Sequence, residues 1–351
     1  MFLSAPLSLS DVVTDGFITQ AGIDDMFRLR GNITEVEYNP QGDSYEVVLH
    51  YGKETQVFDA QIVAHIDADR TTWSWITEPQ FGFLGTWPSD DMITAARTLH
   101  NNGPSFLVPR ADGATDVVLI DRNEFPALHP RTALCVGLAT MPETMDIQRA
   151  ILAFSAVNQL SIHVDENTIT FEDGTVVDLT ARRVIGPLSF ADVVADAFYF
   201  SAEHQLFFDG NYPSPLVAFQ PETNSLIIND SVTAHGILVG TITDKVFRWA
   251  NVPVLRQFAV ENGVSEFLRP EIPVSDAAEL GLDCAAKRIL RHWTHVFVQL
   301  DDDTTALVLA DGPTLRLPAK TVEATEAVLA IPAPPHIDRD RAVASYQQLR
   351  G

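Results

Sequence analysis

The sequence predicts an α+β protein built from two copies of one unit, because segments of its first half recur in the same order in its second half. LSLSDVVTDGFI, which begins at Leu7, returns 181 positions later as LSFADVVADAFY, which begins at Leu188, with seven of twelve residues identical. The length of 351 residues also exceeds the size at which a single core usually stops growing. We therefore expect a tandem duplication of a helix-plus-antiparallel-sheet domain, packed as a pseudo-dimer.

Further repeated segments set the expected domain boundaries. The pairs that keep the order are VEYNP and VAFQP, NNGPSFLVP and ENGVSEFLRP, TDVVLID and TALVLAD, and DIQRAILAF and DRDRAVASY. Ordered matches over most of both halves are hard to obtain by chance. They predict a first α+β repeat over residues 1–160, a structured hairpin linker over 161–187 and a second α+β repeat over 188–351.

Each copy is expected to begin with a helix and to continue with antiparallel strands. Ser10 or Asp11 is a suitable cap for the first helix, Gly31 is a suitable stop, and Gly210 is expected to act likewise in the second copy. Alternating apolar residues and turn signals predict the strands, and a short helix closed by a glycine follows them in each copy.

The linker and one insertion distinguish the two halves. The linker contains Asp173-Gly174, a strong hairpin signal. The second repeat carries an extra helix over 276–291, in which Asp276 and Glu279 have the spacing of a capping box. If this helix covers a sheet face, the equivalent face of the first repeat must be covered by the linker hairpin, by the other domain or by a ligand.

Charge and cysteine content narrow the classes of partner. A net charge of -24 opposes binding to nucleic acid and to anionic membrane surfaces. Cys135 and Cys284 are far apart and form no CxxC motif, so we expect two free thiols, no structural zinc and no cofactor. The start of the chain lacks the pattern of a secretory signal, and no stretch is apolar enough to span a membrane. A cytoplasmic location is the resulting expectation.

Aromatic residues at two predicted strand ends are the sharpest local signal. Trp73 and Trp75 alternate in the first copy, and Phe247 and Trp249 do so in the second, where Asn251 follows. Alternate residues of a strand face one side, so each pair forms an apolar stripe. These five residues are candidates for ligand binding, and the alternative is a place in the core beneath a helix.

The second stripe resembles an uncharacterised bacterial domain family of unknown function. Its members share a Trp-x-Trp-Ala-Asn-like strand end followed by a helix, and Trp249, Ala250 and Asn251 match that pattern. The first copy keeps both tryptophans but has Ile76 and Thr77 in place of Ala-Asn. The resemblance covers mainly the second half, and it implies a related fold and no activity.

Histidines supply the remaining candidates. His65, Asp67 and Asp69 alternate and form a possible metal trio if they share a strand face, although an exposed face explains them as well. His292 and His295 are three residues apart, without the HEXXH pattern of a metalloprotease.

The sequence contains no nucleophile elbow, phosphate loop or dinucleotide fingerprint. The leading hypothesis is therefore a non-catalytic cytoplasmic protein that binds a small ligand or another protein. One alternative is an enzyme with an inter-domain cleft, in which His65, His292 or His295 works with a carboxylate. Another is an acidic inhibitor or immunity-type protein that neutralises a basic partner.

Overall fold

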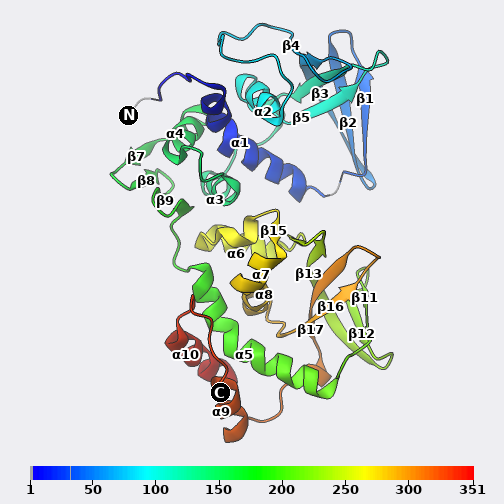
Figure 1. Ribbon diagram of the computed structural model, residues 1–351, viewed down its shortest axis with the longest axis vertical. Coiled ribbons are helices and arrows are strands. Elements are labelled where there is room, and N and C mark those ends of the chain that lie inside the picture. The colour runs from blue at the N-terminus through cyan, green and yellow to red at the C-terminus, as the bar shows by residue number, and fades with distance from the viewer. Residues whose placement is uncertain (1–2, 32) are drawn as a thin grey trace. The chain divides into compact units, whose positions relative to one another are not determined.

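The chain divides into two compact units, here called unit 1 (Met1–Ile185) and unit 2 (Gly186–Gly351). The computed structural model describes residues 3–31 and 33–351 (Figure 1). Residues 161–185, which we expected to form a linker, lie within unit 1.

Unit 1 begins with a long helix, continues with an antiparallel sheet and ends with two helices and a small second sheet. Its main elements are α1 (Leu9–Leu29), β1 (Glu35–Pro40), β2 (Ser44–Tyr51), β3 (Glu54–Ile66), β4 (Trp73–Trp75), α2 (Asp90–Leu99), β5 (Ser105–Pro109), β6 (Thr115–Ile120), α3 (Pro130–Thr140) and α4 (Ile147–Val157). The strand order is β1-β2-β3-β6-β5, and β4 also pairs with β3.

A β-bulge interrupts the pairing of β3 with β6. The register shifts between Ile62 and Ala64, which leaves Val63 as the extra residue. Because side chains alternate between the two faces of a strand, one extra residue exchanges the faces beyond it. Ile62 and His65 therefore lie on the same face although they are three residues apart.

Unit 2 repeats this architecture with an insertion. Its main elements are α5 (Phe190–Asn211), β11 (Val217–Gln220), β12 (Ser225–Ile228), β13 (Val232–Thr243), β14 (Val246–Trp249), α6 (Pro253–Asn262), β15 (Ile272–Pro273), α7 (Val274–Leu280), α8 (Leu282–Leu290), β16 (Thr294–Gln299), β17 (Thr305–Asp311), α9 (Val322–Leu329) and α10 (Arg339–Arg350). Strands β11, β12, β13, β17 and β16 pair in the order seen in unit 1, and β14 pairs with β13 as β4 does with β3.

The bulge is also repeated, because the pairing of β13 with β17 shifts between Leu238 and Gly240. Shared strand order and a shared irregularity confirm the predicted α+β class with a repeated helix-plus-sheet unit. The packing of the two units as a pseudo-dimer stays a prediction.

The caps of the first helices differ from those expected. Ser8 caps α1, because its hydroxyl accepts a bond from the Asp11 amide at 3.1 Å, so the expected cap at Ser10 or Asp11 was wrong. In unit 2, Ser189 forms a capping box with Asp192. Helix α5 continues through Gly210 to Asn211, so the stop expected at that glycine was also wrong.

The insertion begins earlier than the sequence match indicates. Ser105–Pro109 is strand β5, whereas Ser265–Leu268 of the matched segment is a 3-10 turn. The strand that pairs with β17 as β5 pairs with β6 is β16. Two helices replace the single helix expected over 276–291, because Gly281 adopts the left-handed conformation with a φ of 72°. Asp276 is not a cap, since α7 already begins at Val274.

The inserted helix α8 packs on helices α5 and α6. In unit 1, which lacks this helix, α2 packs directly on α1. The expectation of a sheet face in unit 1 laid bare by the missing helix was therefore wrong, since the insertion separates two helices instead of covering the sheet.

Residues 162–184 form the small second sheet of unit 1. Its strands are β7 (Ile162–Val164), β8 (Thr168–Phe171), β9 (Val176–Asp178) and β10 (Arg183–Val184), paired in the order β10-β9-β8-β7. Asp173 and Gly174 form the β8–β9 turn, with a φ of 84° at the glycine. Strand β10 packs on α3, and the Phe171 ring lies 6.3 Å from that of Phe154 in α4, so this sheet packs against the helices of unit 1.

Candidate functional site

A pocket of about 990 Å³ lies on the main sheet of unit 1. It receives side chains from β1, β2, β3 and β5, from β6, and from the β5–β6 turn. The residues that line it are Tyr38, Pro40, Gly42, Asp43, Tyr45, Ile62, His65, Ile76, Val108, Pro109, Arg110, Ala111, Asp112 and Asp116. Two tyrosines and three branched apolar residues make much of its wall apolar, and the charged groups gather around Asp116.

The carboxylate of Asp116 is the centre of a polar network in this pocket. The residue is only 3% exposed, and the strand register places it directly opposite His65 on β3. One oxygen lies 2.6 Å from His65 Nδ1 and 3.4 Å from Arg110 Nη1, and the other accepts a bond from the Tyr45 hydroxyl at 2.9 Å. A buried carboxylate with three polar partners is held in one position.

This network determines which atom of His65 faces a ligand. A carboxylate only accepts hydrogen bonds, so Nδ1 carries a proton, and in the neutral imidazole Nε2 then presents a lone pair. The His65 side chain is 33% exposed and lines the pocket, so a ligand can reach it. Burial and the bond to Asp116 raise the pKa of Tyr45, which therefore remains a donor.

Negative charge surrounds the pocket. Arg110 is the cation among the lining residues, and it lies 3.1 Å from Asp112 as well as close to Asp116. Asp43 adds a third carboxylate. The arrangement therefore favours a ligand group that donates hydrogen bonds or carries positive charge.

The strand register identifies the positions of unit 2 that correspond to His65 and Asp116. Counted from the shared bulge, these are Thr241 and Ala306, which pair with each other as the histidine and aspartate do. The polar network therefore belongs to unit 1 and is not duplicated at these positions.

The structure places the aromatic candidates of the first copy side by side on one face. The rings of Trp73 and Trp75 are 5.1 Å apart, as expected for alternate residues. Trp73 is 1% exposed and packs with Met92 of α2, while Trp75 is half-buried beside this cluster. A ligand that stacks on Trp73 would require the Trp73 side chain to move out of the core.

The second stripe is arranged in the same way. Phe247 is 2% exposed, and its ring lies 4.9 Å from that of Trp249. The Trp249 indole donates to the carbonyl of Glu266, a residue of the insertion, at 3.0 Å. Asn251 is exposed just after the strand. Ligand binding by Trp73, Trp75, Phe247, Trp249 and Asn251 stays a prediction.

The trio His65, Asp67 and Asp69 does not form a joint cluster. His65 is bound to Asp116, and Asp67 instead accepts bonds from the amides of Thr71 and Thr72 at 2.7 and 2.9 Å. These bonds lower the pKa of Asp67 and close a turn after β3. The carboxylate that works with His65 comes from another strand, β6.

His292 and His295 have different partners. His292 Nε2 lies 3.0 Å from Nδ1 of His235, while His295 Nδ1 lies 3.4 Å from the Asp283 carboxylate. Burial, aided by the charge of Lys287, lowers the pKa of His295 to about 4, so this imidazole is neutral at pH 7. The two predicted histidines therefore belong to separate clusters.

A buried lysine in unit 2 was not a candidate from the sequence. Lys287 is 1% exposed, and its ammonium donates to the Ser201 hydroxyl at 2.8 Å and to Asp283 at 3.1 Å. Burial raises the pKa of the adjacent Cys284 thiol to about 12, so this cysteine is protonated and unreactive. This cluster joins α5 to α8 and is best explained as a structural network.

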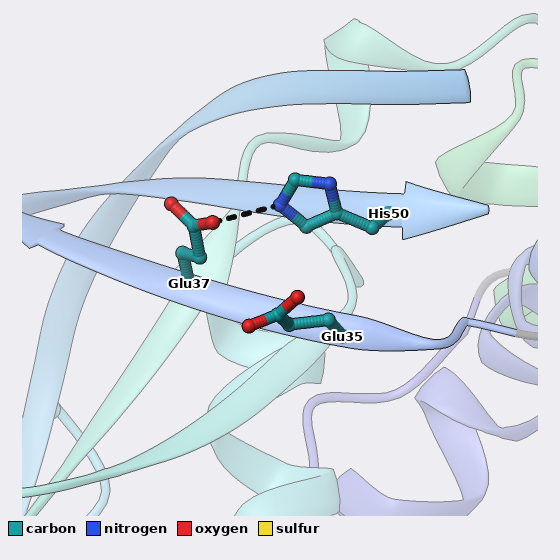
Figure 2. A group of neighbouring side chains, drawn as sticks. All are labelled: Glu35, Glu37 and His50. Carbon is teal, nitrogen blue, oxygen red and sulfur yellow. Dashed lines mark hydrogen bonds and ion pairs between the residues drawn. The ribbon is translucent and has the colours of Figure 1, made fainter. Parts of the chain in front are cut away.

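An exposed acidic cluster lies on β1 and β2. Figure 2 shows Glu35 and Glu37 on one strand and His50 on the next, and their ligand atoms lie within 4.8 Å of one another. His50 Nε2 is bonded to Glu37 at 3.0 Å, and its Nδ1 is bonded to Thr55 at 3.2 Å. Both ring nitrogens thus have partners in the protein, and we assign no metal to this cluster.

Comparison with known proteins finds a family match for one segment of the chain. Residues 191–313 match a family of unknown function, DUF6882, over the part of unit 2 that extends from α5 through β17. No curated protein and no solved structure matches the chain significantly. The predicted resemblance to a family of unknown function is thereby confirmed for this segment, while its Trp-x-Trp motif and bacterial origin stay predictions. Within residues 3–31 and 33–351, none of the helices is both long and apolar enough to cross a bilayer.

Proposed function

We propose that the chain is a non-catalytic cytoplasmic binding protein, and that the pocket on the unit 1 sheet holds a small molecule. The observation that carries this proposal is the buried Asp116 carboxylate, which orients His65 at the wall of a pocket of about 990 Å³. A concave, largely apolar surface with a few fixed polar groups is typical of small-molecule sites.

The chemistry of the wall defines the ligand class. The lone pair of His65 Nε2 accepts a hydrogen bond, and the carboxylates of Asp43 and Asp112 favour positive charge. The apolar body of the ligand packs on side chains such as Tyr38, Ile62 and Val108. An aromatic or branched molecule with a hydroxyl or ammonium group fits these features, whereas nucleic acid does not, because the net charge of -24 opposes it.

The test uses a panel of aromatic amines and alcohols, matched with carboxylic acids of the same size, in ligand-observed NMR. We expect the amines and alcohols to bind with dissociation constants of about 1 mM, typical of fragments, and the acids to bind more weakly. Ile62→Trp fills the pocket and is expected to abolish binding. Gln61→Trp, at the exposed neighbouring position, is the matched control. Binding that survives Ile62→Trp would contradict the proposal.

One observation supports a second candidate. The His65–Asp116 pair, with 2.6 Å between Nδ1 and the carboxylate, has the geometry that orients a general base. If the site is catalytic, the chain hydrolyses p-nitrophenyl acetate about a hundredfold faster than His65→Gln does. Equal rates remove this candidate and leave the binding proposal intact.

A further inference from the structure

Two imidazoles of unit 2 face each other beside the C-terminal end of β17. His235 belongs to β13, and His292 lies two residues before β16, so the two residues flank the end of β17. His235 Nδ1 and His292 Nε2 are 3.0 Å apart. His235 is exposed and His292 is half-buried, so solvent and small ions reach the pair.

The backbone fixes the orientation of His292. Its Nδ1 donates to the carbonyl oxygen of Leu290 at 2.8 Å, so in the neutral imidazole the Nε2 lone pair is directed at His235. Metal-binding histidines generally have this arrangement, in which the second ring nitrogen donates to a carbonyl or carboxylate and holds the ring in place.

We propose that His235 and His292 chelate a divalent transition metal ion of the zinc, nickel or copper class. Zinc–nitrogen bonds of about 2.0–2.1 Å place two ligand nitrogens about 2.9–3.4 Å apart at ordinary coordination angles. The 3.0 Å separation lies in this range. The ring centroids are 5.3 Å apart, so the two nitrogens face each other directly. Binding therefore requires the His235 ring to turn while its proton moves from Nδ1 to Nε2, so that two lone pairs converge on one ion.

The charge near the pair suits a cation. Asp311 lies directly opposite His235 in the β13–β17 pairing, and both residues are exposed. Directly opposed residues of an antiparallel pair project from the same face of the sheet. A carboxylate on this face attracts a divalent ion, and water fills the remaining coordination positions.

The test titrates zinc chloride into the full chain by isothermal calorimetry. We expect one zinc ion at this site, with affinity reduced about tenfold or more by His235→Gln and by His292→Gln. His50→Gln, which alters the acidic cluster of Figure 2, and His163→Gln, an exposed histidine of unit 1, are the matched controls. Both controls are expected to bind zinc like the unchanged chain.

The variants are checked for folding by circular dichroism. His235 is exposed, so its substitution tests the proposal even if His292→Gln is unstable. Unchanged zinc affinity in His235→Gln, or loss of binding in His50→Gln alone, overturns the assignment. Because the pair lies in unit 2 and the ligand pocket in unit 1, this outcome is independent of the proposed function.

Discussion

At the scale of single residues, the two units differ in which polar side chains they bury. Unit 1 holds Asp116 beneath His65 at the wall of a pocket, whereas unit 2 has Ala306 and Thr241 at these positions. Unit 2 instead buries Lys287 between two helices. Copies of one fold thus keep the same backbone pairing while their buried polar groups, which determine chemistry, have diverged.

His204 makes the stability of unit 2 dependent on pH. Its ring lies 4.8 Å from Phe200 and 6.3 Å from Trp293, and burial, followed by the charges of Lys287 and Arg350, lowers its pKa to about 4. In the unfolded chain the histidine pKa is about 6.5, so as pH falls the unfolded state binds a proton before the folded state does. The contribution of neutral His204 to stability is therefore fully present above a pH of about 6.5 and is lost as pH falls toward 4.

We therefore expect the free energy of unfolding of unit 2 to fall by about 2 kcal/mol more between pH 7 and pH 5 in the unchanged chain than in His204→Phe. Hydrogen exchange of the α5 amides, measured at increasing urea concentration, gives the free energy of unfolding of unit 2 at each pH. His163→Gln, whose histidine side chain is 76% exposed, should keep the original pH dependence. An equal loss in His204→Phe contradicts the assignment.

At the scale of elements, one sequence signal has two physical meanings. Both α2 and α6 have an Asn-Gly pair near their C-terminal end, and Gly263, directly after the last helical residue Asn262, ends α6 in the left-handed conformation with a φ of 69°. Helix α2 ends earlier, at Leu99, and Asn101 and Asn102 take the left-handed conformations. Gly103 is required for space, since a Cβ there would lie 1.8 Å from the carbonyl oxygen of Ile120.

Alanine substitutions separate these two roles. Gly263→Ala is expected to cost about 1 kcal/mol, the strain of a side chain in a left-handed conformation. Gly103→Ala is expected to cost about 3 kcal/mol or more, because the backbone of β6 must move. Thermal unfolding of both variants measures the loss of stability. Similar losses in the two variants would show that the close approach of the Ile120 carbonyl does not explain the glycine at position 103.

At the scale of the whole molecule, each unit has its own core and should fold on its own. We expect fragments 1–185 and 186–351 to unfold cooperatively in urea. Fragment 1–160, cut at the boundary expected from the repeat, should be less stable than 1–185, because it lacks the buried side chains of Ile169, Phe171 and Val177. Each such side chain contributes about 1.5–3 kcal/mol. Equal stability of fragments 1–160 and 1–185 would place the boundary at 160.

The pseudo-dimer prediction is tested with the same fragments. If the two units pack as equivalent subunits do, fragments 1–185 and 186–351 should associate when mixed. Analytical ultracentrifugation of the mixture measures this association. Independent sedimentation at high concentration would contradict the prediction.

The sequence by itself determined the fold class, the repeat and most of the elements, because hydrophobic periodicity and turn signals act over a few residues. The alternation in Trp73-Ser74-Trp75, for example, was enough to predict that the two tryptophan rings lie side by side. The candidate site could not be predicted this way. Tyr45, His65, Arg110 and Asp116 come from separate strands and a turn, and Asp116 has only one local signal, a lone acid within an apolar strand.

The bulge shows why only the tertiary structure decided the site. Simple alternation places His65, Asp67 and Asp69 together, but β3 ends at Ile66 and Asp67 closes the turn that follows. The extra residue at Val63 brings His65 to the face of Ile62, and the register of β6 supplies its carboxylate. Contacts between strands depend on register, which is set by long-range packing rather than by local sequence. The same dependence brings together His235 and His292, which lie 57 residues apart in the chain.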